Sequence, residues 1–278
     1  MMRKINYKMI VSDFDHTLVN NDGTISEENK KAITEYVKNG GVFVISTGRL
    51  HYGIVPRAKE LGLKGLVACG QGTVIQDIES GEMISEATLP CEVTARICEK
   101  MEELGLHIHV YAPEDYYSNM DDEPLKLYEH AVRRKAKLVL ESPISGFVRE
   151  NGICSYKVLA MVEPKDNAKI RETLSACDFK GCKVTKSAEY LVEVINASYS
   201  KGTAVEFLAE RFAIPLEKVI CVGDQLNDIP MIEKAGLGIA VKNADEELKK
   251  KALVFDYTNE ESAVGKIIEK YGYTEDEQ

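Results

Sequence analysis

The chain has 278 residues, of which 44% are hydrophobic and 29% charged, a composition typical of a globular protein rather than a disordered or fibrous one. Its formal net charge of -10 argues against a broad basic surface for nucleic acid or anionic membranes. Seven scattered cysteines without a CxxC pair indicate neither a disulfide framework nor a zinc site, and no signal peptide or apolar stretch of membrane-spanning length is visible. We therefore expect a cytoplasmic protein.

The first part of the chain alternates short apolar runs with helical patterns. Residues 9–11 are apolar and break abruptly into the polar stretch 12–15, as a buried parallel strand does at its carboxyl end. Ser26 is a suitable N-cap for a helix that follows, and residues 42–45 and 66–68 form two more apolar runs. Strands that alternate with helices predict a parallel sheet with helices on its faces.

The middle of the chain has a different pattern, with a hairpin and several strands close together. The expected elements are a hairpin at residues 73–77 and 83–88, helices at 91–104 and 165–175, and strands at 107–111, 156–162 and 191–195. We interpret this stretch as an α+β cap domain, residues 84–193, inserted into a core domain formed by residues 1–83 and 194–278.

After the inserted stretch the first pattern returns. We expect a helix beginning near Lys201, strands at 219–222, 237–240 and 253–255, and a helix at 246–250. The fold class is therefore α/β, with a Rossmann-like parallel-sheet core and an inserted α+β cap. Ligands of such sheets bind outside the carboxyl ends of the strands, so the polar residues that follow each strand are the first candidates for a site.

Two aspartates follow the first strand, in the segment Asp13-Phe14-Asp15-His16-Thr17. Alternation along an extended chain separates the two carboxylates, which suits one as a nucleophile and the other as a proton carrier. Aspartates are also common in strand-to-helix loops, so this segment alone leaves both interpretations open.

A second acidic cluster, Asp224, Asn227 and Asp228, follows the strand at 219–222. Mg²⁺ takes oxygen ligands, and aspartates at two strand ends can hold one such ion between them. Ca²⁺ is the rival ion, but the cluster lacks the spaced acidic positions and the terminal glutamate of a calcium-binding loop. A helix cap in a solvated turn is the alternative for Asp228.

Three further side chains or backbone groups suit a phosphate. Thr47-Gly48-Arg49 follows the second strand, where a hydroxyl and backbone N–H groups can hold phosphoryl oxygens. Lys201 stands at the start of a helix and can neutralise a phosphoryl group, although a lone lysine is usually a surface charge. Together these residues supply a nucleophile, a metal site and fixed positive charge, which phosphoryl transfer requires.

In this order the residues resemble the motifs of the haloacid dehalogenase-like superfamily of phosphohydrolases. Residues 13–17 resemble the first motif, Thr47 the second, Lys201 the third, and residues 223–228 the fourth. The large segment between Thr47 and Lys201 is similar to the cap of the Cof-type subfamily (class IIB).

This resemblance implies a Mg²⁺-dependent phosphatase for small phosphate monoesters, with sugar phosphates as the expected substrates. Asp13 would attack phosphorus and become an aspartyl-phosphate, while Asp15 would protonate the leaving alcohol and later activate water. The Asp13 carboxylate, the Asp15 main-chain carbonyl and Asp224 would hold Mg²⁺. Thr47 would bind the transferring phosphoryl group, and Lys201 would brace Asp13.

The same resemblance implies supporting residues and reveals two departures. The residues expected to bind the phosphoryl group or to support its ligands are Thr47, Gly48, Arg49, Asn227 and Asp228. His16 stands where the family usually carries glycine, and it can reshape the pocket entrance. Gln71, between Gly70 and Gly72, replaces an asparagine and puts a family substrate contact in question.

Two other functions fit parts of the pattern. A sugar phosphomutase or phosphotransferase of a related capped branch uses the same groups but excludes water. A receiver-like phospho-acceptor also gathers aspartates, a threonine and a lysine at strand ends, without turnover. The large cap and the second acid, Asp15, favour an enzyme over such a switch.

Selectivity is expected to come from the cap, which supplies contacts to the leaving group in capped folds. The candidates, each of which is also suited to a structural or surface role, are His107, His109, Tyr111, Arg133 and Arg134. Pyridoxal phosphate and flavin mononucleotide are possible substrates besides sugar phosphates. The expected partner is a small-molecule phosphate ester, with no nucleic acid and no membrane, and a monomer is the default expectation.

Overall fold

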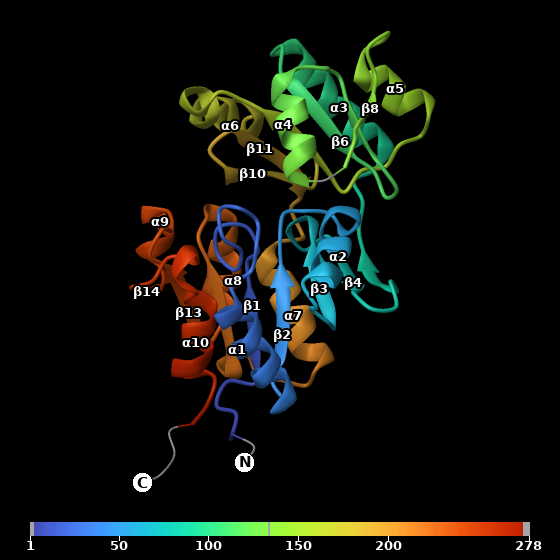
Figure 1. The fold of residues 1–278 in the computed structure, drawn as a ribbon. Coiled ribbons are helices and arrows are strands. Elements are labelled where there is room, and N and C mark those ends of the chain that lie inside the picture. The colour runs from blue at the N-terminus through green and yellow to red at the C-terminus, as the bar shows by residue number, and fades with distance from the viewer. Residues whose placement is uncertain (1–2, 133, 275–278) are drawn as a thin grey trace.

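The protein consists of two sheets with their helices, one placed above an end of the other. The structure, a computed structural model, describes residues 3–132 and 134–274. In this part of the chain the strands form one sheet of eight and one of six. Figure 1 shows the six-stranded unit above the eight-stranded one, with both termini at the opposite end. The expected α/β fold class is confirmed.

The eight-stranded sheet has the order β14-β13-β12-β1-β2-β3-β4-β5. Its strands are β1 (Met9–Ser12), β2 (Val42–Ser46), β3 (Leu66–Cys69), β4 (Val74–Asp77), β5 (Met83–Glu86), β12 (Val219–Gly223), β13 (Leu237–Val241) and β14 (Leu253–Phe255). The strands from β14 to β3 pair in parallel, and β4 and β5 add an antiparallel hairpin. Because parallel strands run the same way, β1, β2 and β12 end at the same edge.

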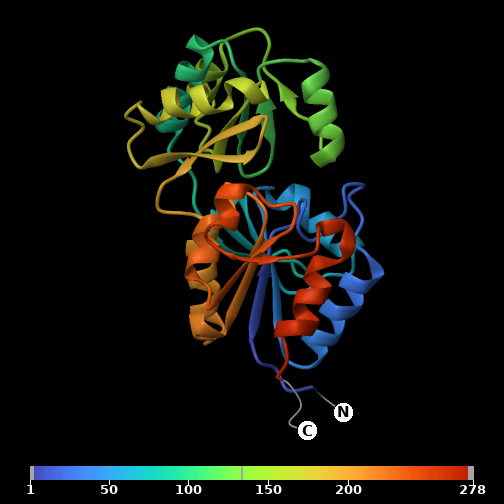
Figure 2. The same cartoon turned by 90° about the vertical axis from the view of Figure 1, so that its left-hand side faces the viewer.

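Helices cover both faces of this sheet. They are α1 (Glu27–Lys38), α2 (His51–Glu60), α7 (Lys201–Arg211), α8 (Ile229–Lys234), α9 (Glu246–Lys249) and α10 (Ala263–Tyr271). Helix α1 packs against α10 and α7 against α8, and Figure 2 shows the two pairs on opposite faces. The strands between them are buried on both sides, which explains their continuous apolar runs. No helix in the described ranges is long and apolar enough to cross a membrane.

The six-stranded sheet has the order β10-β11-β9-β6-β7-β8 and is mostly antiparallel. Its strands are β6 (His107–Tyr111), β7 (Tyr116–Ser118), β8 (Lys137–Leu138), β9 (Lys157–Met161), β10 (Cys182–Ala188) and β11 (Leu191–Asn196). Its helices are α3 (Cys91–Glu103), α4 (Glu123–Val132), α5 (Ile144–Glu150) and α6 (Asn167–Ser175). Alternate strand residues such as Val110, Val158 and Val192 form a separate apolar core. Their neighbours Lys157 and Glu193 point to the other face.

Two elements lie differently from the sequence expectation. The hairpin at residues 73–77 and 83–88, whose second strand was expected to run into the inserted segment, pairs with β3, so the first sheet continues through Glu86. Likewise β11 stays in the second sheet through Asn196. A hairpin is a local signal and does not reveal which sheet its outer strand joins. We propose that the two domains change over close to these points, a few residues beyond the expected boundaries at 83 and 193.

Several elements have no counterpart in the sequence expectation. They are β7, β8, β10, α4, α5, α8 and α10. Strands β7 and β8 have three and two residues, too few for a periodic pattern, and β10 alternates polar residues at a sheet edge. The missed helix α10 covers α1 and closes one face of the first sheet.

Gly202 allows α7 to approach α8 closely. A Cβ atom at Gly202 would overlap the Pro230 carbonyl oxygen, whereas one at Gly146 of α5 would meet nothing of the described chain within 4 Å. We expect Gly202→Ala to lower the free energy of unfolding by about 1–3 kcal/mol through overpacking. Gly146→Ala is the matched control and should raise it by up to about 1 kcal/mol through helix propensity. Urea unfolding measures both, and equal shifts would contradict the close approach.

Candidate active site

The carboxyl ends of β1, β2 and β12 lie at the edge of the first sheet that faces the second (Figure 1), and polar residues follow these ends. Asp13, Thr47 and Asp224 directly follow β1, β2 and β12. The Asp13 N–H donates to the Val222 carbonyl and the Thr47 N–H to the Ala68 carbonyl, so both residues continue the strand ladders by one step. Residues far apart in the sequence therefore reach one place.

Lys201 joins two carboxylates from different segments. Its Nζ donates to Asp13 Oδ1 at 2.5 Å and to Asp228 Oδ1 at 2.6 Å. The side chain is only 1% exposed, so it is not a surface charge. Burial alone would lower the pKa of Lys201, but Asp13 and Asp228 outweigh it and hold this pKa above its usual value. The ammonium therefore stays charged between its two partners.

Asp228 is buried and binds two parts of the site at once, rather than lying in a solvated turn. One of its oxygens accepts from Lys201, and the other accepts from the backbone N–H groups of Asp224 and Gln225, both at 2.9 Å. A Cβ atom at Gly223 would lie 2.5 Å from the Asp228 side chain, so glycine is needed there. Asp228 thus fixes the acidic loop and Lys201 together.

Three carboxylates share this small space. Oxygens of Asp13, Asp224 and Asp228 lie within 4.8 Å of one another, and Asp224 also accepts from the Thr17 hydroxyl at 2.8 Å. Burial and the Asp228 charge raise the pKa of Asp224 to about 7. Burial likewise raises the pKa of Asp13 well above its usual value, against the opposing charge of Lys201. One ammonium does not balance three carboxylates, and this surplus negative charge in an all-oxygen donor set fits a divalent cation.

Asp15 is held apart from this cluster by Arg49. The guanidinium donates to both Asp15 oxygens, at 2.8 and 2.7 Å, a two-point contact that fixes the plane of the carboxylate. Arg49 also donates to the Ala131 carbonyl at the end of α4, while its backbone N–H donates to the Thr47 hydroxyl. Arg49 therefore connects the expected proton carrier, the expected phosphate loop and the second sheet.

The backbone conformation at His16 and Gln71 explains why the family usually carries other residues at these two positions. His16 has φ of 56° and Gln71 has φ of 63°, both in the left-handed region. Glycine adopts this region freely and asparagine tolerates it better than most residues, which accounts for the residues usual at these positions. The Gln71 carboxamide oxygen accepts from Asn227 at 2.9 Å, so Asn227 contacts Gln71 rather than Lys201.

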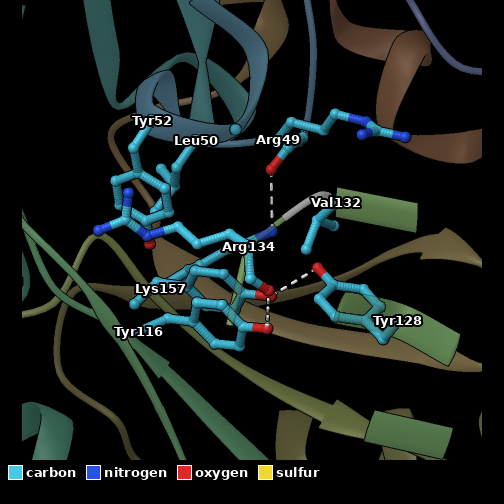
Figure 3. A pocket seen from close by; sticks show the side chains of 11 residues that line it. Arg49, Leu50, Tyr52, Tyr116, Tyr128, Val132, Arg134 and Lys157 are labelled. Atoms are coloured by element: carbon cyan, nitrogen blue, oxygen red, sulfur yellow. Dashed lines mark hydrogen bonds between the residues drawn. The ribbon is translucent and has the colours of Figure 1, made fainter. Parts of the chain in front are cut away.

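The cap candidates named from the sequence are occupied by contacts with other side chains, most of them in the second unit and one, Tyr52, in α2 of the first. His107 and His109 contact each other, and the Tyr111 hydroxyl donates to Tyr128. Arg134 stacks on Tyr52 at 4.3 Å, as Figure 3 shows, and pairs with Asp115. Arg133 lies outside the described residues.

Two charged residues missed from the sequence reach the first sheet instead. Lys157 donates to the Gly48 carbonyl at 2.9 Å, and Glu193 accepts from the Gln71 side chain at 3.0 Å. A single charge inside each of two otherwise apolar strands was the signal that could have identified them.

Comparison with known proteins decides the family. The model of haloacid dehalogenase-like hydrolases matches residues 10–268. The chain belongs to this family. The six-stranded sheet lies between Thr47 and Lys201 in the chain, and the fold is similar to that of a solved subclass IIB sugar phosphatase, which is 18% identical with a TM-score of 0.81 over 95% of this chain and 99% of that one.

Several relatives of this haloacid dehalogenase-like protein are named phosphatases. Phosphatase YwpJ of Bacillus subtilis is 30% identical over 94% of this chain and 98% of its own. The 5-amino-6-(5-phospho-D-ribitylamino)uracil phosphatase YwtE of the same species is 28% identical over 95% and 97%. A solved haloacid dehalogenase-like hydrolase from B. subtilis is 26% identical, with a TM-score of 0.84 over 95% of this chain and 99% of that one. The expectation of an enzyme, a phosphoric monoester hydrolase, is confirmed.

Lys201→Met tests the role of the central ammonium. It leaves two buried carboxylates without their cation, so we expect the free energy of unfolding in EDTA to fall by about 3–5 kcal/mol. Adding Asp228→Asn to Lys201→Met removes one of the two unpaired buried charges. The double variant should therefore regain part of the lost free energy of unfolding. Urea unfolding of the two single variants and the double variant measures the coupling, and additivity within about 0.5 kcal/mol would contradict the contact.

Proposed function

We propose that this phosphatase hydrolyses small phosphate monoesters through an aspartyl-phosphate on Asp13, with Mg²⁺ as its metal. The observation that supports this most is the buried ammonium of Lys201 between Asp13 and Asp228, beside Asp224. It gives one carboxylate a fixed position and a charge partner while the cluster keeps surplus negative charge. Such an arrangement suits a nucleophile that attacks phosphorus next to a cation.

The metal fits the donors that the site offers. Asp13 and Asp224, with the Asp15 main-chain carbonyl, would hold Mg²⁺, because both oxygens of Asp228 already have partners. The ion would supply positive charge that offsets the charge of the phosphoryl oxygens.

In the first step a carboxylate oxygen of Asp13 attacks phosphorus, and the bond from phosphorus to the leaving oxygen breaks. Protonated Asp15 gives its proton to that oxygen, which leaves as an alcohol. Lys201 keeps Asp13 oriented, and Thr47 with the backbone of Gly48 holds the phosphoryl oxygens.

In the second step water attacks the same phosphorus atom. Asp15, now ionised, takes a proton from this water, and the bond between phosphorus and Asp13 breaks. Inorganic phosphate leaves and the Asp13 carboxylate is regenerated. Both Asp15 oxygens accept from Arg49, so one of these hydrogen bonds is released when Asp15 carries a proton, while the other keeps the carboxyl group oriented.

We further propose that the substrates are sugar or polyol phosphates. The name of the relative YwtE describes an ester whose phosphate sits on a ribityl chain. Pyridoxal phosphate and flavin mononucleotide are the other members of the substrate panel. All seven cysteines are free thiols, which fits a reducing compartment and supports the cytoplasm as the location.

Asp13→Asn and Asp15→Asn separate the two carboxylate roles. Asp13→Asn removes the nucleophile, so phosphate release from every ester should fall by at least about 10³-fold. Asp15→Asn should still release p-nitrophenolate from p-nitrophenyl phosphate in a burst equal to the enzyme concentration, because this leaving group departs as an anion without a proton from Asp15, and then stall. Stopped-flow absorbance measures the burst. Full activity of Asp13→Asn would contradict the proposal.

Removal of the metal is an independent test. Phosphate release should stop in EDTA and return with Mg²⁺, but not with Ca²⁺, which prefers more ligands at longer distances. A malachite-green assay with each ion measures this. Activity that persists in EDTA would contradict the metal assignment, and interconversion of glucose 1- and 6-phosphate faster than phosphate release would replace the hydrolase with a mutase.

A further inference from the structure

Strand β8 is an outer strand of the six-stranded sheet, which ends there in the part of the chain that the structure describes. The Val139 N–H, just after the strand, donates to the Ser118 carbonyl of β7 at 2.8 Å. Along an extended chain the backbone groups of successive residues point alternately to one side and the other. The N–H and C=O groups of Leu138 and Leu140 are therefore directed away from the sheet, where a further strand can pair with them.

This outer strand exposes apolar side chains. Leu138 and Leu140 are 45% and 57% exposed, whereas Val139 between them is buried in the apolar core of the six-stranded unit. Edge strands of natural proteins usually carry lysines, proline or a bulge that prevents pairing with another chain. The other edge, β10, follows this rule, because it contains Lys183 and Lys186 and a register shift and also contacts the eight-stranded unit. Strand β8 instead leaves its apolar residues open to a partner.

The exposed run is complementary to itself. It reads Lys137-Leu138-Val139-Leu140-Glu141, with opposite charges at its two ends. When two copies of the run lie antiparallel about a twofold axis at Val139, each Leu138 faces Leu140 of the partner subunit. Each Lys137 then faces Glu141 of the partner subunit. Apolar pairs and pairs of opposite charge at directly opposite positions both stabilise a sheet.

The backbone fits the same register. Directly opposite residues of an antiparallel pair alternate between those that exchange two hydrogen bonds and those that exchange none. Leu138 and Leu140 have the outward backbone groups, and the axis at Val139 places them opposite each other, so each of these pairs can exchange two hydrogen bonds. Val139, whose N–H is already bonded to β7, falls at the position that requires none.

The segment that leads into β8 is fixed within its own chain. The buried Glu129 of α4 accepts from the Ala136 N–H at 2.8 Å and from Lys135 Nζ at 2.5 Å. Lys137 Nζ lies 2.6 Å from Asp115 and stays exposed, and an ammonium has three N–H groups to donate. A strand that is held in place beforehand loses little conformational entropy when it binds a partner.

We propose that β8 is the interface of a homodimer, in which it pairs antiparallel with β8 of a second copy of this chain. The two six-stranded sheets then join into one continuous sheet. Twofold symmetry uses the same surface on both copies, so every contact occurs twice. The inference replaces the default expectation of a monomer, and it does not depend on the proposed hydrolysis.

The outer strand β14 of the first sheet provides a matched control. Its Leu253 is 44% exposed, nearly the same fraction as Leu138. About an axis at Val254, however, Lys251 would face Tyr257, so this edge lacks the opposite charges that make β8 complementary to itself. A substitution of the same kind at the two leucines therefore separates the β8 interface from a general effect of exposed apolar edges.

Sedimentation velocity from about 1 to about 200 µM measures the assembly, and the wild type should shift from monomer toward dimer over this range. Leu138→Lys should raise the dissociation constant of the dimer by at least about tenfold, because the substitution enters the interface twice. Leu253→Lys should leave this constant within about twofold of wild type.

Lys137→Glu and Glu141→Lys test the antiparallel register. Each variant alone places like charges opposite each other on both sides of the axis, so its dissociation constant should rise by at least about tenfold. In an equimolar mixture of the two variants every lysine again faces a glutamate, and the dissociation constant should return to within about threefold of wild type. Mixing would not repair a variant that fails to fold.

Three results would overturn the assignment. The first is a wild-type protein that stays monomeric at about 200 µM. The second is a Leu253→Lys variant that weakens the dimer as much as Leu138→Lys does, since the dimer would then not use β8 specifically. The third is a mixture of Lys137→Glu and Glu141→Lys that associates no more tightly than either variant alone.

Discussion

The contact of the Lys201 ammonium with Asp13 and Asp228 is the interaction on which the candidate site depends. A parallel sheet brings the ends of its central strands to one edge, and here those ends carry carboxylates that repel one another when buried. A cation must lie among them for the edge to close. Lys201 provides it from the first position of α7, where the Ser200 side chain caps the helix.

The residues around Lys201 fix the position of its side chain. Gly202 lets α7 lie against α8, and Gly72 leaves room for the Ser200 carbonyl where a Cβ atom would overlap it. Asp228 binds the ammonium with one oxygen and the backbone of its own loop with the other. The position of Asp13 therefore follows from the packing of α7 against α8, from the N-cap of α7 at Ser200 and from the loop that contains Asp228.

The sequence predicts this part of the molecule well because the relevant signals are local. Apolar runs that break into polar residues mark the ends of β1, β2 and β12, and parallel strand direction then brings Asp13, Thr47 and Asp224 together. The roles of these residues in the reaction stay predictions. Other features depend on distant partners: the Arg49 contact with Asp15 needs both loops in place.

The interface between the sheets is where sequence patterns carry least information. Lys157 and Glu193 lie within apolar strands, and nothing local shows that their partners are Gly48 and Gln71. The hairpin of β4 and β5 is visible in the sequence, but the sheet it joins is not. His16 and Gln71 appear as departures from a pattern until their positive φ angles show why smaller or more tolerant residues are usual there.

The account's central claim is that Asp13 carries the phosphoryl group. A single turnover with ³²P-labelled ester, quenched in acid, reduced with borohydride and mapped by mass spectrometry, tests it most directly. The account predicts acid-stable label on the protein before reduction, and after reduction, which releases that label as phosphate, homoserine in place of Asp13 and at no other aspartate. Homoserine at a different aspartate, or full turnover with no label on the protein before reduction, would contradict it.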